Sequence, residues 1–215
     1  PGGLAPARVV SLALELTAAL EAAHTAGLVH RDLKPANVML LDAPGGRDFV
    51  KVLDFGIARP ITDATQMTET GKLVGTPHYL APEVVEGEVP GPEADLYALG
   101  IILYELCTGG RPFEGSSSAR VMYAHVHEAP PPLPPAVPRA LAALILRLLD
   151  KDPTARPRSA ATLRALLEAL SLGSTARAPD DVPEDTAAAP RATTPPAALS
   201  PPGASSPAAP RALGT

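Results

Sequence analysis

Polar side chains that suit phosphate chemistry gather near the start of the chain, at Asp32, Lys34, Asn37 and Asp54. A carboxylate can accept a proton from a hydroxyl group, and an ammonium group can neutralise a phosphate. Carboxylate and amide oxygens are ligands that Mg²⁺ prefers. Phosphoryl transfer needs this help, because the transferred group carries its charge on three oxygens. Residues of these types could therefore serve chemistry on a phosphate group.

The elements around these residues are predicted to bring them together. Apolar residues recur at helical spacing over residues 6–26, and Gly27 follows as a stop signal. Two short β-like runs, 38–41 and 49–53, are separated by a turn-forming stretch that contains Pro and Gly, which predicts a hairpin. The turn and the hairpin are expected to bring all four polar groups to one edge.

The order of residues around these groups resembles a known family. His30-Arg31-Asp32-Leu33-Lys34-Pro35-Ala36-Asn37 and Asp54-Phe55-Gly56 are similar to the catalytic loop and the magnesium-binding motif of protein kinases. At about one in twenty for each fixed residue, the five fixed positions of the first motif recur by chance only about once in millions of windows. The resemblance implies ATP and Mg²⁺ as cofactors.

The resemblance also implies a role for each residue of the first motif. Asp32 accepts the proton of the substrate hydroxyl, and Lys34 reaches the γ-phosphate. Asn37 and Asp54 hold Mg²⁺. Met39 falls where the family places an apolar side chain under adenine, with simple core packing as an equal alternative.

Two residues beside Asp32 are expected to be structural rather than catalytic. In the family the histidine of this motif, here His30, packs on the phenylalanine that is Phe55 here, and transfers no proton. Arg31 marks kinases whose activation loop is ordered when a phosphate pairs with the guanidinium. The remaining histidines are assigned background roles: His24, His78, His125 and His127.

A second segment extends the resemblance. The stretch Gly75-Thr76-Pro77-His78-Tyr79-Leu80-Ala81-Pro82-Glu83 looks like the substrate-docking end of the activation loop. Thr76 is expected to bond toward Asp32 and Lys34. By resemblance, Glu83 forms a buried ion pair with Arg156, and Asp95 bonds to the backbone of the catalytic loop.

The class of substrate also follows from the resemblance. Lys34 with Thr76 is the serine/threonine pattern, so protein substrates with Ser or Thr are expected. Thr68 and Thr70 match activation-loop positions that are phosphorylated in bacterial relatives, which implies another kinase copy as a partner. The alternative is that both are merely solvated loop threonines.

The rest of the chain predicts a mainly helical fold. Residues 57–92 show no period and are predicted to be a long loop, whereas 93–108 are apolar on all sides and predict a buried helix. Further helices are expected at 139–149 and after Ser159, with Gly173 as the last stop. The expected fold is α+β, mainly α-helical: the large C-terminal lobe of a protein kinase with a small β-hairpin, over residues 1–173. Residues 174–215 hold few large apolar side chains and are predicted to be a disordered tail.

Composition narrows the classes of function. A net charge of −5 argues against a broad basic surface for nucleic acid. The sequence has no stretch of about 18 apolar residues, so a membrane span is not expected in this chain. The single cysteine, Cys107, fits a reducing cytoplasm, although a longer parent protein anchored in a membrane stays open.

The family's ATP-clamping half has no counterpart in the printed sequence. A Gly-rich loop before His30 is missing, and none of the lysines can be the strand lysine that holds the α- and β-phosphates: Lys34, Lys51, Lys72 and Lys151. One hypothesis is a partial catalytic domain that is inactive or nearly so alone. The other is a catalytically silent kinase-like module that docks or regulates protein partners.

Overall fold

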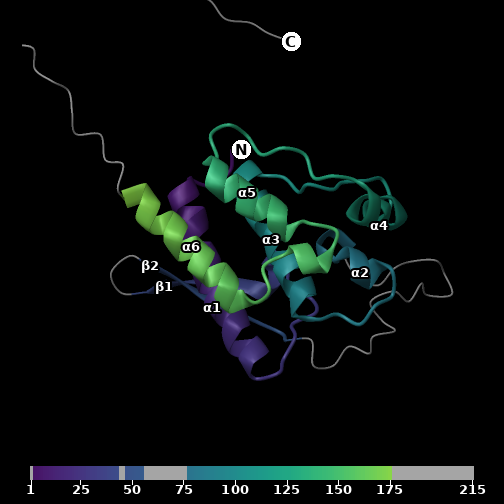
Figure 1. Cartoon of the computed structure of the whole chain (residues 1–215), viewed down its shortest axis with the longest axis horizontal. Helices are drawn as coiled ribbons and strands as arrows, with labels where there is room; N and C mark the ends of the chain where they lie inside the picture. Colours follow the sequence, from purple (N-terminus) through teal and green to yellow (C-terminus); the bar gives the residue numbers. More distant parts are fainter. Residues whose placement is uncertain (1, 44–46, 56–76, 176–215) are drawn as a thin grey trace, which may run out of the picture. The chain divides into compact units, whose positions relative to one another are not determined.

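The computed structural model describes residues 2–43, 47–55 and 77–175. The chain divides into one unit over Pro1–Ala178 and a second over Pro179–Thr215. The first unit holds every described element and is mainly helical, with one small antiparallel sheet (Figure 1). Residues 176–215 of the predicted tail lie outside the described residues, and so do Gly56, Thr68, Thr70 and Thr76. The first two residues of the predicted tail, 174 and 175, are helical. No described helix is long and apolar enough to cross a membrane.

The first helix, α1 (Pro6–Thr25), starts at a proline and buries one face. Proline suits the first helical position because it lacks the backbone N–H, which would have no partner within the helix there. The buried face carries Val9, Leu12, Leu16 and Leu20, and packs against α6 (Ala160–Thr175) and α3 (Pro92–Thr108). This amphipathic helix agrees with the predicted one to within a residue.

The predicted hairpin is formed by β1 (Val38–Ala43) and β2 (Arg47–Val52). The strands pair antiparallel, with Val38 opposite Val52, and make a sheet of two strands. A hairpin of this size is marginal alone, so its stability depends on packing. β2 packs on α1.

Helix α3 is the centre of the core. Twelve of its seventeen residues are buried, as its largely apolar sequence predicts. Gly109 ends it in the left-handed conformation with φ 79°. Helix α5 (Arg139–Leu148) packs on it at Gly100, where a Cβ would lie 2.8 Å from the Cβ of Leu148. Glycine is needed at this position because the two helices approach so closely.

The structure corrects three predictions. The stretch 57–92, predicted to be a loop, contains a 3₁₀ turn at Pro77–Tyr79 and the short helix α2 (Pro82–Val85). Helix α4 (Ser118–His127), which the sequence analysis missed, starts at Ser117, whose hydroxyl accepts the N–H of Arg120. Helix α6 runs past Gly173 to Thr175, because one glycine costs a helix only about 1 kcal/mol.

Candidate active site

Asp95, in the first turn of α3, holds the loop that carries Asp32. Its carboxylate accepts the backbone N–H of His30 at 2.8 Å and that of Arg31 at 2.9 Å. Nε2 of His24 lies 2.9 Å from the same carboxylate. A carboxylate that is only 1% exposed is costly unless its oxygens are bonded, and these contacts supply the bonds.

His30 uses both ring nitrogens inside the protein. Nδ1 accepts the backbone N–H of Asp32 at 3.3 Å, and Nε2 lies 2.9 Å from the carbonyl oxygen of Leu53. A carbonyl can only accept, so Nε2 carries the proton. The ring also packs on Phe55, with centroids 4.8 Å apart. His30 therefore ties the loop to the end of the hairpin and has no free nitrogen for proton transfer.

Lys34 and Asn37 converge on Asp32. Nζ of Lys34 lies 2.8 Å from Oδ2 of Asp32. The amide nitrogen of Asn37 donates to the Asp32 carbonyl oxygen at 2.7 Å and to Oδ2 at 3.4 Å. The Lys34 and Asp32 side chains are 23% and 27% exposed, so a solute can reach them. The arrangement places an acid beside a cation and an amide, as acceptance of a proton next to a phosphate requires.

Asp54 lies two residues after the end of β2. The N–H of Leu53 donates to the carbonyl oxygen of Asn37 at 2.8 Å, so the backbones next to Asp54 and Asn37 are joined. The Asp54 side chain is exposed. Asp54 and Arg31 have positive φ angles of 53° and 67°, which are uncommon for residues other than glycine and cluster at functional sites.

The residues present fit a magnesium ion that is shared with phosphate. Both hydrogens of the Asn37 amide point to Asp32, so its oxygen is the atom suited to a cation. The carboxylate of Asp54 supplies a second hard oxygen. Within the described ranges, no group of three or more His, Cys, Asp or Glu side chains could hold a metal. The donor set suits Mg²⁺, which is commonly bound through one or two side chains and substrate phosphates.

Met39 does not belong to the core. Its side chain is 44% exposed, and those of Leu40 and Phe49 on the same hairpin are 49% and 52% exposed. Simple core packing, the alternative left open for Met39, is therefore excluded. Thr76, Thr68, Thr70 and Gly56 cannot be placed, because they lie outside the described residues.

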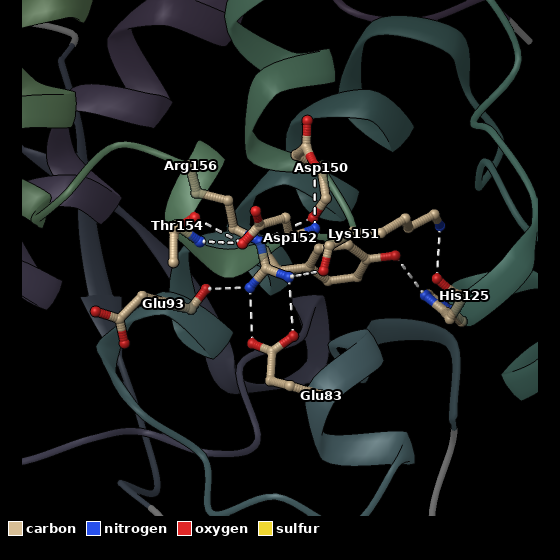
Figure 2. A network of polar contacts seen from close by, with 9 residues as sticks. Glu83, Glu93, His125, Asp150, Lys151, Asp152, Thr154 and Arg156 are labelled. Atoms are coloured by element: carbon tan, nitrogen blue, oxygen red, sulfur yellow. Dashed lines mark hydrogen bonds and ion pairs between the residues drawn. The ribbon is translucent and has the colours of Figure 1, made fainter.

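Arg156 and Glu83 form a bidentate ion pair (Figure 2). Nη1 and Nη2 of Arg156 lie 2.7 and 2.8 Å from the two carboxylate oxygens of Glu83. The other N–H groups donate to backbone carbonyls of Glu93, Asp150 and Lys151. All five donors of a guanidinium that is 1% exposed are thus used.

Two histidines that form long-range hydrogen bonds in the structure were assigned no specific role from the sequence. His24, assigned a background role, holds Asp95, and His125 forms a buried hydrogen bond with Tyr97. The available signal for His24 was its place four residues after Leu20 on the apolar face of a predicted helix. His125 offered no such signal, because α4 itself was not predicted.

Comparison with known proteins agrees with this geometry. Residues 2–167 match the family model described as "Protein kinase domain". The chain is 45% identical over 172 residues to serine/threonine-protein kinase Pkn3 of Myxococcus xanthus, covering 76% of this chain and 31% of that protein. It is 42% identical over 174 residues to PknA of Mycobacterium tuberculosis, with coverage of 81% and 39%.

Serine/threonine-protein kinase Pkn1 of Myxococcus xanthus is 46% identical over 168 residues, which are 77% of this chain and 24% of that protein. The chain thus spans between about a quarter and two fifths of the length of these relatives. The family match covers far more than half of the chain, and it includes the loop of Asp32, the hairpin and the Glu83–Arg156 pair. This chain therefore belongs to the protein kinase family.

Proposed function

We propose that this chain is the catalytic and substrate-binding part of a serine/threonine protein kinase, which transfers the γ-phosphate of ATP to Ser and Thr hydroxyls of proteins. The convergence of Lys34 and Asn37 on Asp32 carries this proposal. Asp95, which is buried, holds their loop in place.

Each residue of the site has one task in this proposal. Asp32 orients the substrate hydroxyl and accepts its proton. Lys34 neutralises charge on the transferred group, while Asn37 and Asp54 hold Mg²⁺. Bound MgATP supplies the phosphoryl group and neutralises charge as it moves. The protein therefore contributes position and charge rather than a covalent intermediate.

The substrate class is proposed from residues and relatives together. The relatives above carry names of serine/threonine-protein kinases. Lys34 lies beside Asp32, and we propose that it forms the serine/threonine pattern together with Thr76. Thr68 and Thr70 are proposed as sites phosphorylated by another copy of the kinase, with Arg31 as the residue that pairs with a phosphate.

A nucleotide-binding lobe is proposed to complete the site. The hairpin exposes Met39, Leu40 and Phe49, and a neighbouring groove of about 280 Å³ is lined mostly by apolar side chains of α1, β1 and α3. Contiguous apolar surface of this kind is typical of an interface. Since no lysine of the sequence can serve the α- and β-phosphates, we expect the chain alone to transfer no phosphate.

Because no lysine of the sequence can hold the α- and β-phosphates, a second candidate is also favoured: a catalytically silent module that docks protein partners. The two candidates differ in what happens when the first half of a kinase domain is supplied. We therefore consider this chain fused behind the first half of the Pkn3 kinase domain of Myxococcus xanthus, called the completed kinase below. A completed kinase that binds ATP but transfers no phosphate would support the silent module.

The decisive variant is Asp32→Asn in the completed kinase. Loss of the proton acceptor is expected to lower phosphate transfer to a model protein by about 10²–10⁴-fold, while ATP binding persists. Transfer is measured with radiolabelled ATP and binding by calorimetry. Asp152→Asn, a change of an exposed acid elsewhere, is the matched control and should leave transfer unchanged. Transfer retained by Asp32→Asn would contradict the proposal.

A further inference from the structure

His125 is fully buried on α4, and phosphoryl-transfer chemistry assigns it no role. Its Nδ1 lies 2.9 Å from the hydroxyl of Tyr97 on α3, which is also fully buried. The imidazole ring packs edge-on against Phe113, with centroids 4.9 Å apart. Nε2 of His125 is buried and has no hydrogen-bond partner among the described residues, so the bond to Tyr97 is the polar contact that holds the ring. Loss of a buried hydrogen bond is costly.

The Tyr97–His125 bond is a neutral link. Burial lowers the pKa of His125 to about 3, and the positive charge of Lys151 acts in the same direction. Burial raises the pKa of the Tyr97 hydroxyl above its ordinary value. At neutral pH the hydroxyl therefore keeps its proton and donates it to Nδ1. The link does not change its charge between pH 5 and 8, so it serves geometry rather than proton transfer.

Tyr97 connects this link to the Arg156–Glu83 pair. The guanidinium carbon of Arg156 lies 4.9 Å from the centre of the Tyr97 ring, in a cation–π contact. Glu83, which binds Arg156, belongs to α2. Contacts therefore run without a break from His125 on α4, through Tyr97 and Arg156, to α2.

Lys151 holds the same end of α4. Its ammonium group donates to the carbonyl oxygens of His125 and Ala124, which belong to the last turn of the helix. It also lies over the Phe113 ring, 4.2 Å from the centroid. A cation is favourable at a helix C-terminus, where carbonyl groups lack partners within the helix. Two polar contacts thus fix the end of α4 that carries His125.

Helix α4 in turn packs against the segment 77–85. It contacts the turn Pro77–Tyr79 and α2. In the proposed function, the segment 77–85 belongs to the part of the kinase that receives the protein substrate.

We propose that His125 and Tyr97 are positioning residues, whose hydrogen bond fixes α4 against the segment 77–85 and so sets how a protein substrate lies before Asp32. The effect on substrate rests on the proposed function. The mechanical coupling of α4 to the segment does not.

Hydrogen exchange on the 215-residue chain tests the coupling. The reporter amides are those of Leu80, Val84 and Val85, which donate to backbone carbonyls within the segment. His125→Phe keeps an aromatic ring but removes the acceptor. Because a hydrogen bond contributes modestly to stability, exchange at these amides should become about three- to tenfold faster. Amides of α1 and α6 should be unchanged.

Matched variants separate positioning from general damage. Tyr97→Phe should reproduce the effect of His125→Phe, and His125→Asn, whose side-chain oxygen can replace Nδ1, should largely reverse it. His127→Phe and Tyr104→Phe, on the same two helices, should leave the reporter amides unchanged. Wild-type exchange at these amides in His125→Phe, or equal acceleration in His127→Phe, would overturn the coupling.

The effect on substrate is measured in the completed kinase. His125→Phe should raise KM for a model protein substrate about three- to tenfold, at unchanged kcat and unchanged KM for ATP. A lower kcat at unchanged KM would overturn the role in positioning substrate. The exchange experiment needs no phosphate transfer, so a failure of the proposed function and a failure of the coupling are told apart.

Discussion

Arg156 and Glu83 lie 73 residues apart in the chain, and their side chains meet in a buried ion pair with two short N–H···O contacts. The remaining donors of the guanidinium bind backbone carbonyls, among them that of Glu93 at the start of α3. The pair thus joins α2, α3 and the stretch before α6. Loss of either partner should be costly, because the remaining charge would be buried without compensation.

Removal of one partner of this pair should destabilise the fold strongly. Arg156→Met is expected to lower the free energy of unfolding by about 3–5 kcal/mol, since the carboxylate of Glu83 is left buried without its cation. Urea unfolding followed by circular dichroism measures the change. Arg158→Met, at an exposed position nearby, is the control and should cost less than about 0.5 kcal/mol. A loss below about 1 kcal/mol for Arg156→Met would contradict this account.

Asp95→Asn should loosen the catalytic loop. An amide of the same shape can accept only one of the two backbone N–H bonds from His30 and Arg31 well, and it presents hydrogens to the other donor. We expect a loss of about 2 kcal/mol in stability and faster hydrogen exchange at the amides of both residues. Glu88→Gln, an exposed acid-to-amide change, should affect neither measurement. Unchanged exchange at both amides would mean that Asp95 does not hold the loop.

Gly100→Ala tests the close approach of α3 and α5. Alanine favours helices over glycine by about 1 kcal/mol, but its Cβ would lie 2.8 Å from the Cβ of Leu148. The cost of overpacking should exceed this gain, so the free energy of unfolding should fall by about 1–3 kcal/mol, measured by thermal or urea unfolding. Gly110→Ala adds a methyl group where no atom lies within 4 Å and should be close to neutral. A stabilising Gly100→Ala would show that the two helices can separate at little cost.

Acid should destabilise the fold through His125. Its pKa is about 3 when folded and 6.5 ordinarily, so between these values the unfolded chain binds a proton that the folded chain does not. Stability is therefore lost as pH falls below 6.5, by about 2 kcal/mol for this residue at pH 4.5. His125→Phe should lack this contribution, so its unfolding free energy should decline less between pH 6.5 and 4.5. Parallel curves for the two proteins would contradict the burial of a neutral histidine.

Lys151 predicts a second pH-dependent window, on the alkaline side and of the same sign. Burial, with the charge of Arg156, lowers the pKa of Lys151 from 10.5 to about 8. Between these values the unfolded chain again binds more protons, so stability rises with pH. The difference in unfolding free energy between wild type and Lys151→Met should therefore grow in favour of wild type from pH 8 to 10. A constant difference would show that the ammonium is as well solvated in the fold as in water.

Elements with a clear pattern of apolar residues could be predicted from the sequence. The helix at 6–26 has one apolar face, and the helix at 93–108 is apolar all round, so both patterns survive in the structure as α1 and α3. Helix α2 and the turn Pro77–Tyr79 were missed because they are too short to show a period. Helix α4 has few apolar positions and gains its place from tertiary contacts.

By itself the sequence determined the family and the local motif. Asp32, Lys34 and Asn37 lie in one short loop, so their spacing in the sequence already places them close together. The tertiary structure decided the long-range contacts. Nothing near His125 in the sequence indicates Tyr97 as its partner, and His24 reaches Asp95 only because α1 packs on α3. Such pairs depend on burial, which strengthens a hydrogen bond once the fold has removed water, and burial is a property of the packed chain rather than of any short segment.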